Sequence, residues 1–549
     1  MLLEKAKDPA FWEKVRTAAV YRPLIDALQA VWKKHCEGDI PACKFTDYIL
    51  FDVTGDRDAY ETPYFSRRMA LSASAILSMI YPDEKKYFDK LCDVIWAILD
   101  EYDWCLPAHC ANFHDNDARV IDLFSAETGC ALSEIDYLLA DRLPPLIRGR
   151  IDALVDQRIM KLYETKNFWW ENCEINWAAV CMGSVAIAYI YKHPERFEAI
   201  RPRMEETLRC FLAGFPEDGV CLEGLAYWDY GFGFYVFLAD MVLQFTDGKI
   251  NYFDHPKIRQ IVKFPGRMFL DGGTTVSFSD SGMRGHWPLG VVHYLKNRFP
   301  DEVRMLPDAY RYTTHHTGRW PAYLRAFLWL DESLEDPPEE NGEYTDYAPD
   351  AAWLIKKTKN YCFAAKGGHN GEPHNHNDLG HFIVTRNGRQ ILCDPGTGPY
   401  TRQYFGKERY QFFHTCSRGH SVPIINGQYQ KAGREHRAAA DYADGVFTLE
   451  FANAYGIPEL TKLTRQFSPE EDGLTLRDTF AFRTDALPVT ERFVSCLAPE
   501  MTDGGVAIGG LLLKADGTVS VSREEGFWCI DYALNPGQSE FVLRISVQE

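Results

Sequence analysis

The spacing of apolar residues changes once along this chain of 549 residues. From about residue 10 to residue 330, apolar residues recur with the period of a helix, in segments separated by short runs that contain Pro, Gly or Asp. From about residue 351 to the end they alternate with a period of two, which is typical of half-buried strands. The two patterns predict a helical part followed by a β part.

Several helical segments are apolar on more than one face. The clearest of them cover residues 67–81, 86–102, 120–143, 175–192 and 228–245. A helix of this kind is buried on several sides. We therefore predict inner helices in a multilayer helical assembly, because a single bundle would be too small for this many hairpins.

A short acidic stretch separates the two patterns. Residues 331–350, DESLEDPPEENGEYTDYAPD, contain several prolines and almost no apolar periodicity, which predicts an exposed linker. We therefore expect a helical domain over residues 1–330, this linker, and a β domain over residues 351–549.

Turn signals divide the β domain into hairpins. Asn387-Gly388 lies between two apolar-rich runs, which is the strongest short-range signal for a two-residue hairpin turn. Further signals of this kind occur at Asn426-Gly427, Asp472-Gly473 and Asp516-Gly517. The pattern predicts an antiparallel β-sandwich.

The balance of charge limits the partners of the chain. It carries 59 basic and 78 acidic residues, a net charge of −19, which argues against binding to nucleic acid or to an anionic membrane. An acidic sugar is compatible with this charge if it binds in a local cationic and hydrogen-bonding pocket.

The sequence also bears on the location of the protein. The N-terminal residues lack the uninterrupted apolar core of a secretory signal, and no stretch approaches the ~20 apolar residues of a membrane span. The 15 cysteines are scattered instead of densely spaced. These features predict a reduced, cytoplasmic protein, and they are compatible with a homo-oligomer.

The densest polar cluster is the segment GGHNGEPHNHNDLGH. It contains His369, His374, His376, His381 and Asp378. Histidine changes its charge near neutral pH and is a common metal ligand. The cluster therefore indicates either acid–base and metal chemistry or a polar loop that uses His, Asn and Asp for its turns.

The expected hairpin brings a carboxylate toward this cluster. If its turn has two residues, Asp394 faces His381 at the base of the hairpin. His376 lies just before the same strand, so it is expected at the same end of the sheet as Asp394. With His420, in SRGHSVPIINGQYQ, they form a set that suits zinc, which accepts imidazole nitrogen and carboxylate oxygen. The alternative is a hydrogen-bonded His and Asp pair that shapes the loops.

Two helical segments place polar groups among apolar ones. In ENCEINWAAVCMGS, Asn176 lies at the start of an apolar helix, where helix capping is the more common role. In DGVCLEGLAYWDYGFGFY, carboxyl and phenol groups lie among glycines, although aromatic residues at such spacings more often belong to a core. The polar residues of this second segment are Asp218, Glu223, Tyr227, Asp229 and Tyr230.

Together these segments resemble the heparinase II/III-like polysaccharide lyases, which include heparinases and oligoalginate lyases, over nearly the whole chain. In that family an α/α toroid precedes a β-sandwich that opens with an H-x-H segment, followed by an aspartate before Pro-Gly and by a distal histidine. The corresponding residues here are His374-Asn375-His376, Asp394-Pro395-Gly396 and His420. The resemblance implies a toroid in the helical domain and a sandwich after the linker.

The resemblance also implies roles for individual residues. The family's D-G-x-x-x-E-G-x-x-Y stretch matches residues 218–227, which makes Tyr227 the counterpart of the catalytic tyrosine, with Tyr230 as the alternative. Asn176 matches the active-site asparagine, and His374 matches the first histidine of H-x-H. The implied ligands of a structural zinc ion are His376, Asp394 and His420. The implied substrate-binding residues are Trp177, Glu223, Tyr230 and His109.

The chain departs from the family at two positions. Some relatives have His directly after the asparagine, where this chain has Trp177, and some have Arg two residues after the tyrosine, where it has Asp229. Fewer groups are therefore left to offset a substrate carboxylate, so the substrate cannot be copied from one relative.

The implied activity is cleavage of a uronic-acid-containing glycan by β-elimination. Glycosaminoglycan oligosaccharides are the first expected substrate, followed by alginate and other uronans. Asn176 would neutralise the uronate carboxylate, and Tyr227 and His374 would act as acid and base.

Two other functions stay open. A toroid-fold glycoside hydrolase would use a pair of carboxylates from Asp218, Glu223 and Asp229. A non-catalytic glycan-binding protein would use exposed aromatic residues such as Trp104, Trp169 and Trp170.

Overall fold

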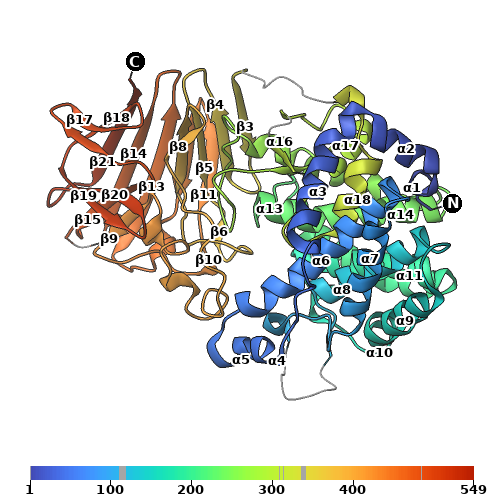
Figure 1. Ribbon diagram of the computed structural model, residues 1–549. Helices are drawn as coiled ribbons and strands as arrows, with labels where there is room; N and C mark the ends of the chain where they lie inside the picture. The colour runs from blue at the N-terminus through green and yellow to red at the C-terminus, as the bar shows by residue number, and fades with distance from the viewer. Residues whose placement is uncertain are drawn as a thin grey trace. The chain divides into compact units, whose positions relative to one another are not determined.

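The computed structural model describes residues 2–110, 119–307, 310–312, 314–334, 342–483 and 485–548. The chain divides into two compact units, one helical and one built of strands (Figure 1). The helical unit comprises residues 1–214, 227–258 and 287–337, and the β unit comprises residues 215–226, 259–286 and 338–549.

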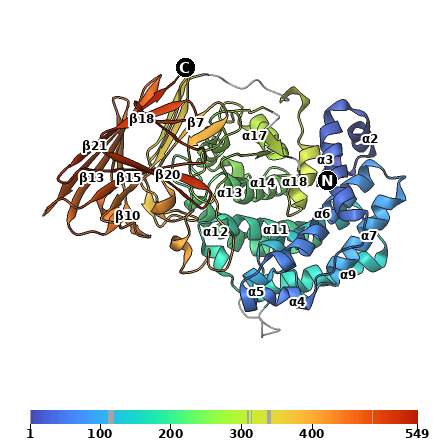
Figure 2. The same ribbon diagram turned by 60° about the vertical axis from the view of Figure 1, so that its left-hand side comes forward.

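The helical unit has two layers of helices (Figure 2). The inner helices are α6 (Asp58–Ile80), α8 (Leu123–Leu138), α11 (Asn176–Lys192), α14 (Gly233–Phe245) and α18 (Trp320–Leu328). The outer helices are α2 (Pro9–Thr17), α3 (Arg22–Cys36), α7 (Lys85–Leu99), α9 (Pro145–Val155), α12 (Phe197–Ala213) and α17 (Leu289–Arg298). Each outer helix packs against an inner neighbour, and α11 contacts α8, α12 and α14. This arrangement agrees with the expected α/α toroid.

The inner helices are buried because their sequences leave little polar surface. In α11 every side chain from Ala178 to Ile190 is buried, and α8 is buried from Ser125 to Asp136. The prediction of inner helices is therefore confirmed. None of the helices in the described part of the chain is both long and apolar enough to cross a membrane.

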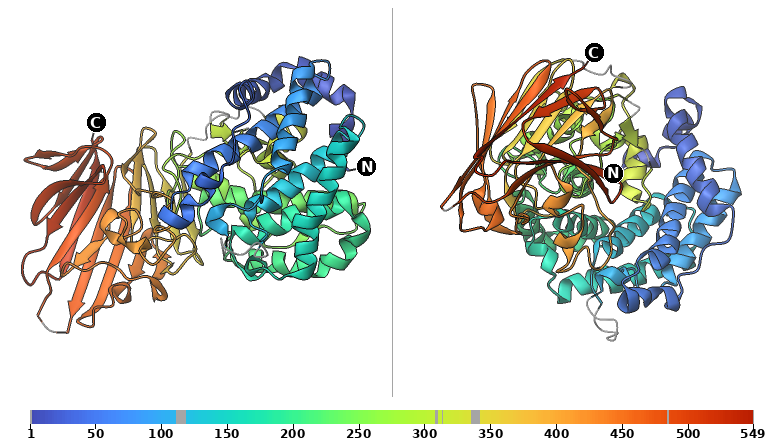
Figure 3. Two further views of the ribbon diagram at one scale, coloured as in Figure 1. Left: turned by 60° about the horizontal axis from the view of Figure 1, so that its bottom comes forward. Right: turned by 90° about the vertical axis from the view of Figure 1, so that its left-hand side faces the viewer.

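Three antiparallel sheets form the body of the β unit (Figure 3). The eight-stranded sheet has the order β11 (Ala439–Ala443), β12 (Val446–Glu450), β13 (Leu460–Pro469), β14 (Gly473–Phe482), β21 (Glu540–Val547), β18 (Leu511–Ala515), β17 (Gly505–Ile508) and β16 (Glu500–Thr502). The five-stranded sheet has the order β3 (Tyr344–Ala348), β4 (Trp353–Lys357), β5 (Cys362–Lys366), β7 (Phe382–Arg386) and β8 (Arg389–Leu392). The four-stranded sheet has the order β19 (Thr518–Glu524), β20 (Phe527–Ala533), β15 (Val489–Ser495) and β9 (Pro423–Ile425).

An aromatic core joins these sheets. The ring of Phe467 in β13 lies 5.2 Å, between centroids, from the rings of Phe363 in β5 and Phe382 in β7. Phe382 in turn lies 6.1 Å from Phe493 in β15. Side chains from all three sheets thus share one apolar interior, as in a β-sandwich.

The β7–β8 hairpin differs from its predicted register at one point. Asn387 and Gly388 form the predicted turn with positive φ angles of 52° and 71°, and Thr385 pairs with Gln390 as expected. Val384, however, pairs with Leu392, because a β-bulge inserts one residue into β8. The expected pairing of His381 with Asp394 is therefore displaced, although the two side chains still approach one another.

The observed units differ from the domains expected from the sequence. Residues 344–348 of the expected linker form β3, which pairs with β4, and residues 335–341 lie outside the described residues. Residues 215–226 and 259–286, expected in the helical domain, pack with the β unit. These two segments contain little regular secondary structure, so apolar periodicity could not assign them.

Candidate functional site

The histidine motif lies in the loop between β6 (His369–Asn370) and β7. The backbone of His374 is left-handed, with a φ of +55°. A non-glycine residue pays a free-energy cost for this conformation, and such residues often occur at functional sites. The His374 side chain is 16% exposed, whereas that of His376 is fully buried. The loop thus presents one histidine to the outside and turns the other inward.

Asp280 connects these two histidines. The Nδ1 atom of His374 lies 2.8 Å from Asp280 Oδ2, and the Nε2 atom of His376 lies 3.2 Å from Asp280 Oδ1. Tyr404 and Arg409 also donate hydrogen bonds to this carboxylate. Burial alone would raise the pKa of Asp280, but the hydrogen bonds from the two histidines outweigh it and hold the pKa well below its usual range.

The remaining ring nitrogen of His374 faces a second carboxylate. Its Nε2 atom lies 3.6 Å from Glu223 Oε2, beyond hydrogen-bond distance. Because Asp280 is ionised and can only accept, His374 donates through Nδ1, and Nε2 carries the lone pair in the neutral ring. This nitrogen is suited to take a proton, and the nearby carboxylate would stabilise the imidazolium that forms.

Glycines on either side make room for the segment that carries Asp280. Gly224 follows Glu223, and Gly396 follows the Asp394-Pro395 pair. A Cβ atom added at these glycines would lie 2.9 Å from the Cβ of Ser281 and 2.3 Å from its carbonyl oxygen, respectively. Both glycines also have positive φ angles. No other residue would fit at either position without moving the segment.

Four buried side chains form a cluster that could hold a metal ion. They are His376, Asp378, Asp394 and His420, and one ligand atom of each lies within 4.8 Å of the others. The Nδ1 atom of His420 is 3.6 Å from an oxygen of Asp394 and 3.9 Å from one of Asp378. Ligands of a tetrahedral zinc ion are about 3.4 Å apart. The four groups would therefore have to move closer together to hold such an ion.

Hydrogen bonds fix which nitrogen of each histidine faces the cluster. His376 donates through Nε2 to Asp280, and His420 donates through Nε2 to the carbonyl of His414 at 3.0 Å. Their Nδ1 atoms, like Oδ2 of Asp378 and Asp394, are buried without a hydrogen-bond partner among the described residues. Buried polar atoms are rarely left unsatisfied. The atoms that lack partners are those that a metal ion would bind, so the residues fit such an ion.

His381 has a different role in this cluster. Its Nδ1 atom accepts a hydrogen bond from the backbone N–H of Ser421 at 2.9 Å, so its proton is on Nε2. This proton faces Asp394 Oδ2 at 3.4 Å. No hydrogen bond joins the two groups, and His381 does not offer a lone pair to a metal.

Burial and neighbouring charges shift the pKa values of the cluster in different directions. Burial would raise the pKa of Asp378, but the buried ammonium of Lys366, 2.9 Å away, outweighs it and lowers the pKa. Burial raises the pKa of Asp394 well above its usual range, reinforced by the charge of Asp378. Burial lowers the pKa of His420 to about 3, so its imidazole is neutral, as metal binding requires.

Arg465 fastens the two chain segments that carry the histidines. Its buried guanidinium donates to the carbonyls of Gly380 at 2.9 Å and Ser421 at 2.7 Å. It is held in turn by Asp478 at 2.5 Å and Glu491 at 2.8 Å. Arg465 thus links the sandwich core to the segments that follow His376 and His420.

In the helical unit, Asn176 is the first residue of α11 and is 1% exposed. The N-cap is Ile175, and no side chain caps the helix. Helix capping, the more common role for such an asparagine, therefore does not apply. A Cβ atom added at Gly231 would lie 2.9 Å from the Cα of Asn176, so the glycine allows the two segments to meet.

Gly231 belongs to a π-helical turn that follows Tyr227. The turn η6 (Trp228–Phe232) lies between α13 (Leu225–Tyr227) and α14. Such turns are rare and often occur at functional sites. Tyr227 is partly exposed at the beginning of this turn, whereas Tyr230 is buried.

Buried charges surround Tyr230. Its hydroxyl donates to Glu127, and the guanidinium of Arg319 lies 3.6 Å from the centre of its ring. Burial raises the pKa of Glu127 to about 7, against the opposing effect of the Arg319 charge. Arg319 also lies 3.8 Å from Asp229, which accepts a hydrogen bond from Tyr312. Tyr230 thus lies in a network that contains one cation and two acids.

The other candidates of the helical unit occupy one aromatic cluster. His109 is bonded to Asp122 at 2.7 Å, its ring stacks on Phe124, and Trp177 contacts its edge. Trp177 also packs against Trp169, whose side chain is exposed. Asn176 and Trp177 are neighbours in sequence, but Asn176 is buried and Trp177 is partly exposed.

Two features weaken the alternative functions. One carboxylate oxygen of Asp218 accepts hydrogen bonds from the backbone N–H groups of Asp350 and Ala351, both at 2.9 Å, so this acid stabilises the β3–β4 turn. Trp104 and Trp170 are fully buried and cannot stack on a sugar. Glu223 and Asp229 remain as candidate carboxylates for a hydrolase. Trp169 remains as an exposed aromatic residue for glycan binding.

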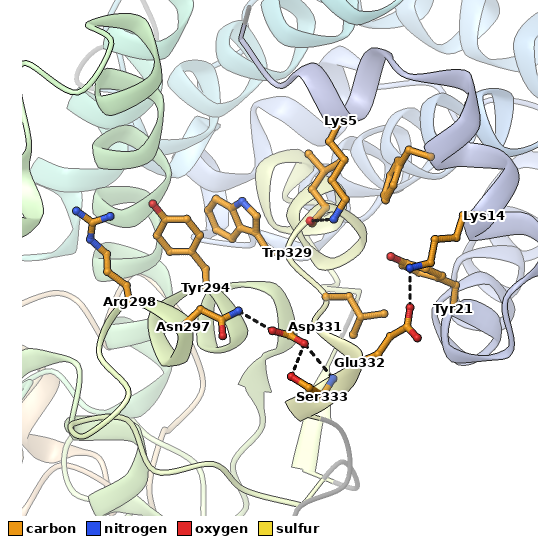
Figure 4. Close-up of a pocket in the computed structure, with 13 residues that line it drawn as sticks. Lys5, Lys14, Tyr21, Tyr294, Asn297, Arg298, Trp329, Asp331, Glu332 and Ser333 are labelled. Carbon is orange, nitrogen blue, oxygen red and sulfur yellow. Dashed lines mark hydrogen bonds and ion pairs between the residues drawn. The ribbon is translucent and has the colours of Figure 1, made fainter.

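A cavity of about 990 Å³ occupies another part of the helical unit (Figure 4). At its edge Lys14 pairs with Glu332 at 2.7 Å, and Asp331 accepts hydrogen bonds from Asn297 and Ser333. None of the candidate catalytic or ligand residues lines this cavity. Because these charged groups already have partners, we assign the chemistry to the clusters around His374 and Tyr230.

The structure adds residues that the sequence patterns did not single out. They are Asp280, Tyr404 and Arg409 in the β unit, and Glu127 and Arg319 in the helical unit. Asp378 was named as part of the histidine motif, and the structure adds that it lies with the three expected ligands. The others lie in segments without a motif, and their partners are distant in sequence.

The structure combines a helical toroid, an antiparallel β-sandwich and a buried cluster of His and Asp side chains. These three features define the class of protein. Residues 341–530 match the sequence model of a family described as Heparinase II/III-like, C-terminal. The chain is therefore similar to a heparinase II/III-like C-terminal domain over these residues, and the resemblance to these lyases is confirmed. No curated protein sequence matches the chain.

Solved structures of polysaccharide lyases have a similar fold. Heparan sulfate lyase HepC from Pedobacter heparinus matches with a TM-score of 0.60 at 14% identity, covering 100% of this chain and 87% of that one. Heparinase III matches with a TM-score of 0.60 at 12% identity, covering 98% and 92%. Chondroitin AC lyase from Streptomyces coelicolor A3 matches with a TM-score of 0.53 at 11% identity, covering 98% and 82%. These similarities confirm the predicted fold class.

Proposed function

We propose that the protein is a polysaccharide lyase that cleaves uronic-acid-containing glycans by β-elimination. The observation that carries this proposal is the arrangement of His374, which is partly exposed and bonded through Nδ1 to the buried Asp280 at 2.8 Å. A histidine held in this way within a heparinase II/III-like domain is suited to remove a proton from a sugar.

Elimination first requires that the uronate carboxylate be neutralised. The C5 proton is barely acidic while the carboxylate keeps its charge, so donors that stabilise the enolate lower the barrier, by a few kcal/mol each in other enzymes. Asn176 can donate from its amide. Arg319, the cation beside Tyr230, is a second candidate for this task.

Proton transfer then needs a base and an acid. His374 can take the C5 proton through Nε2, and Tyr227 can donate a proton to the departing O4. If both events occur on the same face of the sugar, Tyr227 can perform both.

The proposed substrate is a glycosaminoglycan oligosaccharide. The similar structures include enzymes named for heparan sulfate and chondroitin, which are acidic polysaccharides. In this chain, Phe405 is 47% exposed and its ring contacts that of His374, with 6.4 Å between centroids. Tyr400 packs against Phe405 and is 37% exposed. These rings offer a surface on which a sugar can stack beside the base.

The activity can be tested through the product. Elimination creates a conjugated unsaturated uronate that absorbs ultraviolet light, whereas hydrolysis creates none. We expect absorbance to rise with at least one uronate-containing glycan in a panel. Tyr227→Phe and His374→Ala should each lower kcat by about 100-fold or more. Wild-type protein that produces no absorbance with any glycan would contradict the proposal.

We also propose a structural zinc ion at the cluster of His376, Asp378, Asp394 and His420. Two imidazoles and two carboxylates would give a closed, four-coordinate site, which is typical of structural zinc. Such an ion would hold the loop that carries His374 and would satisfy the buried atoms that lack partners. Elemental analysis should find one zinc per chain in the wild type and in His374→Ala, but little in His376→Ala. Equal zinc in both variants would contradict the assignment.

A further inference from the structure

The carboxylate of Asp280 is hydrogen-bonded to four side chains, which is more than the orientation of one histidine requires. Its Oδ2 atom lies 2.8 Å from Nδ1 of His374 and 3.0 Å from Nη2 of Arg409. Its Oδ1 atom lies 3.2 Å from Nε2 of His376 and accepts a hydrogen bond from the hydroxyl of Tyr404. One fully buried carboxylate therefore receives four donors, two of which are the histidines of the H-x-H segment.

The backbone around Asp280 is held in a fixed position. Residues 277–281 are all buried, and Ser279 has a left-handed φ of +64°. The Ser279 hydroxyl donates to the carbonyl of Leu222 at 2.8 Å, and Ser281 fits closely between Gly224 and Gly396. Strained residues persist only where the surrounding structure determines them. The segment is thus built to keep the carboxylate in one place.

We infer that Asp280 is a positioning residue that orients both the catalytic base and a metal ligand. This inference rests on the proposed function of His374 as the base. By accepting from Nδ1 of His374, Asp280 places the lone pair of the neutral ring on Nε2, the atom that would receive the substrate proton. By accepting from Nε2 of His376, it turns Nδ1 toward the proposed metal ion. Carboxylates that accept from metal-bound histidines fix the ring orientation in this way.

The partners of Asp280 decide what a substitution would do. An asparagine at this position keeps one accepting oxygen but presents an amide with N–H donors in place of the other oxygen. All four neighbouring groups are donors, so at least one of them would face the amide without an acceptor. The amide cannot hold both histidines at once, whichever way it is turned.

The experiment compares Asp280→Asn with wild type and with Asp271→Asn. Asp271 is a matched control, because it lies in the same segment and its carboxylate accepts a backbone N–H, that of Gly388 at 2.7 Å. Zinc affinity is measured by competition with a chelator, kinetics are measured at saturating zinc, and crystal structures report the two histidine rings.

We expect Asp280→Asn to lower kcat by about 100-fold with KM changed less than about threefold, since misplacement of a catalytic group acts on the chemical step. We expect zinc affinity to fall about 10- to 100-fold. Asp271→Asn should match wild type in both. The crystal structure of the variant should show the His374 ring rotated away from its wild-type position.

Three results would overturn the inference. The first is wild-type kcat and zinc affinity in Asp280→Asn, and the second is unchanged histidine rings. The third is full recovery of kcat with excess zinc, which would show that Asp280 serves the metal alone. If wild-type protein has no lyase activity, the proposed function fails, but zinc affinity and ring orientation still decide whether Asp280 positions the two histidines.

Discussion

The left-handed backbone of Ser279 is unusual, because such φ angles cost a residue other than glycine about 1 kcal/mol or more. We predict that Ser279→Ala lowers the melting temperature more than Ser279→Gly. Both variants lose the hydrogen bond to Leu222, but only glycine relieves the backbone. At an ordinary position the order is reversed, because glycine is about 0.5–1 kcal/mol less stable than alanine. Thermal unfolding of the two variants tests this, and a lower melting temperature for Ser279→Gly would contradict it.

Glu127 makes stability depend on pH. Burial raises its pKa to about 7, so the folded state holds a proton that the unfolded state releases above about 4.5. The contribution of Glu127 to stability is therefore present below pH 4.5 and is lost as the pH rises through 7. The loss is on the order of 3 kcal/mol.

We predict that Glu127→Gln flattens the fall in melting temperature between pH 5 and about 7.5. The exposed pair of Glu206 with Arg209 supplies the control. The pKa of Glu206 is lowered by its hydrogen bond with Arg209, so Glu206→Gln should leave this slope unchanged. Equal slopes in wild type and Glu127→Gln would contradict the assignment.

At the scale of elements, the π-helical turn η6 depends on the absence of a side chain at Gly231. A Cβ atom there would lie 2.9 Å from the Cα of Asn176 and 3.1 Å from the ring of Phe211. We predict that Gly231→Ala destabilises the protein by about 1–3 kcal/mol, although alanine is the better helix former. It should also lower kcat, because Asn176 is displaced.

Gly233 provides the control for this substitution. It begins α14 two residues later, and a Cβ atom there would lie 3.9 Å from Asp229, an ordinary contact. Gly233→Ala should therefore keep or slightly raise the melting temperature. Similar effects of both substitutions on melting and kcat would show that close packing against Asn176 is not the cause.

Elements with a strong local signal could be predicted from the sequence. The turn at Asn387-Gly388 was predicted because both residues tolerate positive φ angles. The bulge in β8 was not predicted, because it depends on how β8 packs and no residue type signals it. The side chains of Asp394 and His381 still approach, since a shift of one residue at the end of a strand is small on the scale of a side chain.

At the scale of the whole molecule, periodicity predicted the two kinds of unit but not all of their segments. Residues 259–286 carry Asp280 and are preceded and followed in sequence by segments of the helical unit, yet they pack with the sandwich. They contain little regular structure, so no period marks them. The H-x-H motif predicted His374 and His376, whereas the carboxylate that joins them lies 94 residues from His374 and could be found only from the fold.

The proposed zinc ion should govern the stability of the folded chain. Without it, Nδ1 of His376 and His420 and Oδ2 of Asp378 and Asp394 are buried without hydrogen bonds among the described residues. Each such atom costs about 1–3 kcal/mol. We predict that a chelator lowers the melting temperature and that added zinc raises it in proportion to the logarithm of its concentration, because the ion binds the folded state.

Calorimetry over a zinc series measures this. His374→Ala should retain the dependence, since its side chain is outside the cluster, whereas Asp394→Ala should lose it. A melting temperature that is indifferent to chelator and zinc would mean that these buried groups are satisfied in another way.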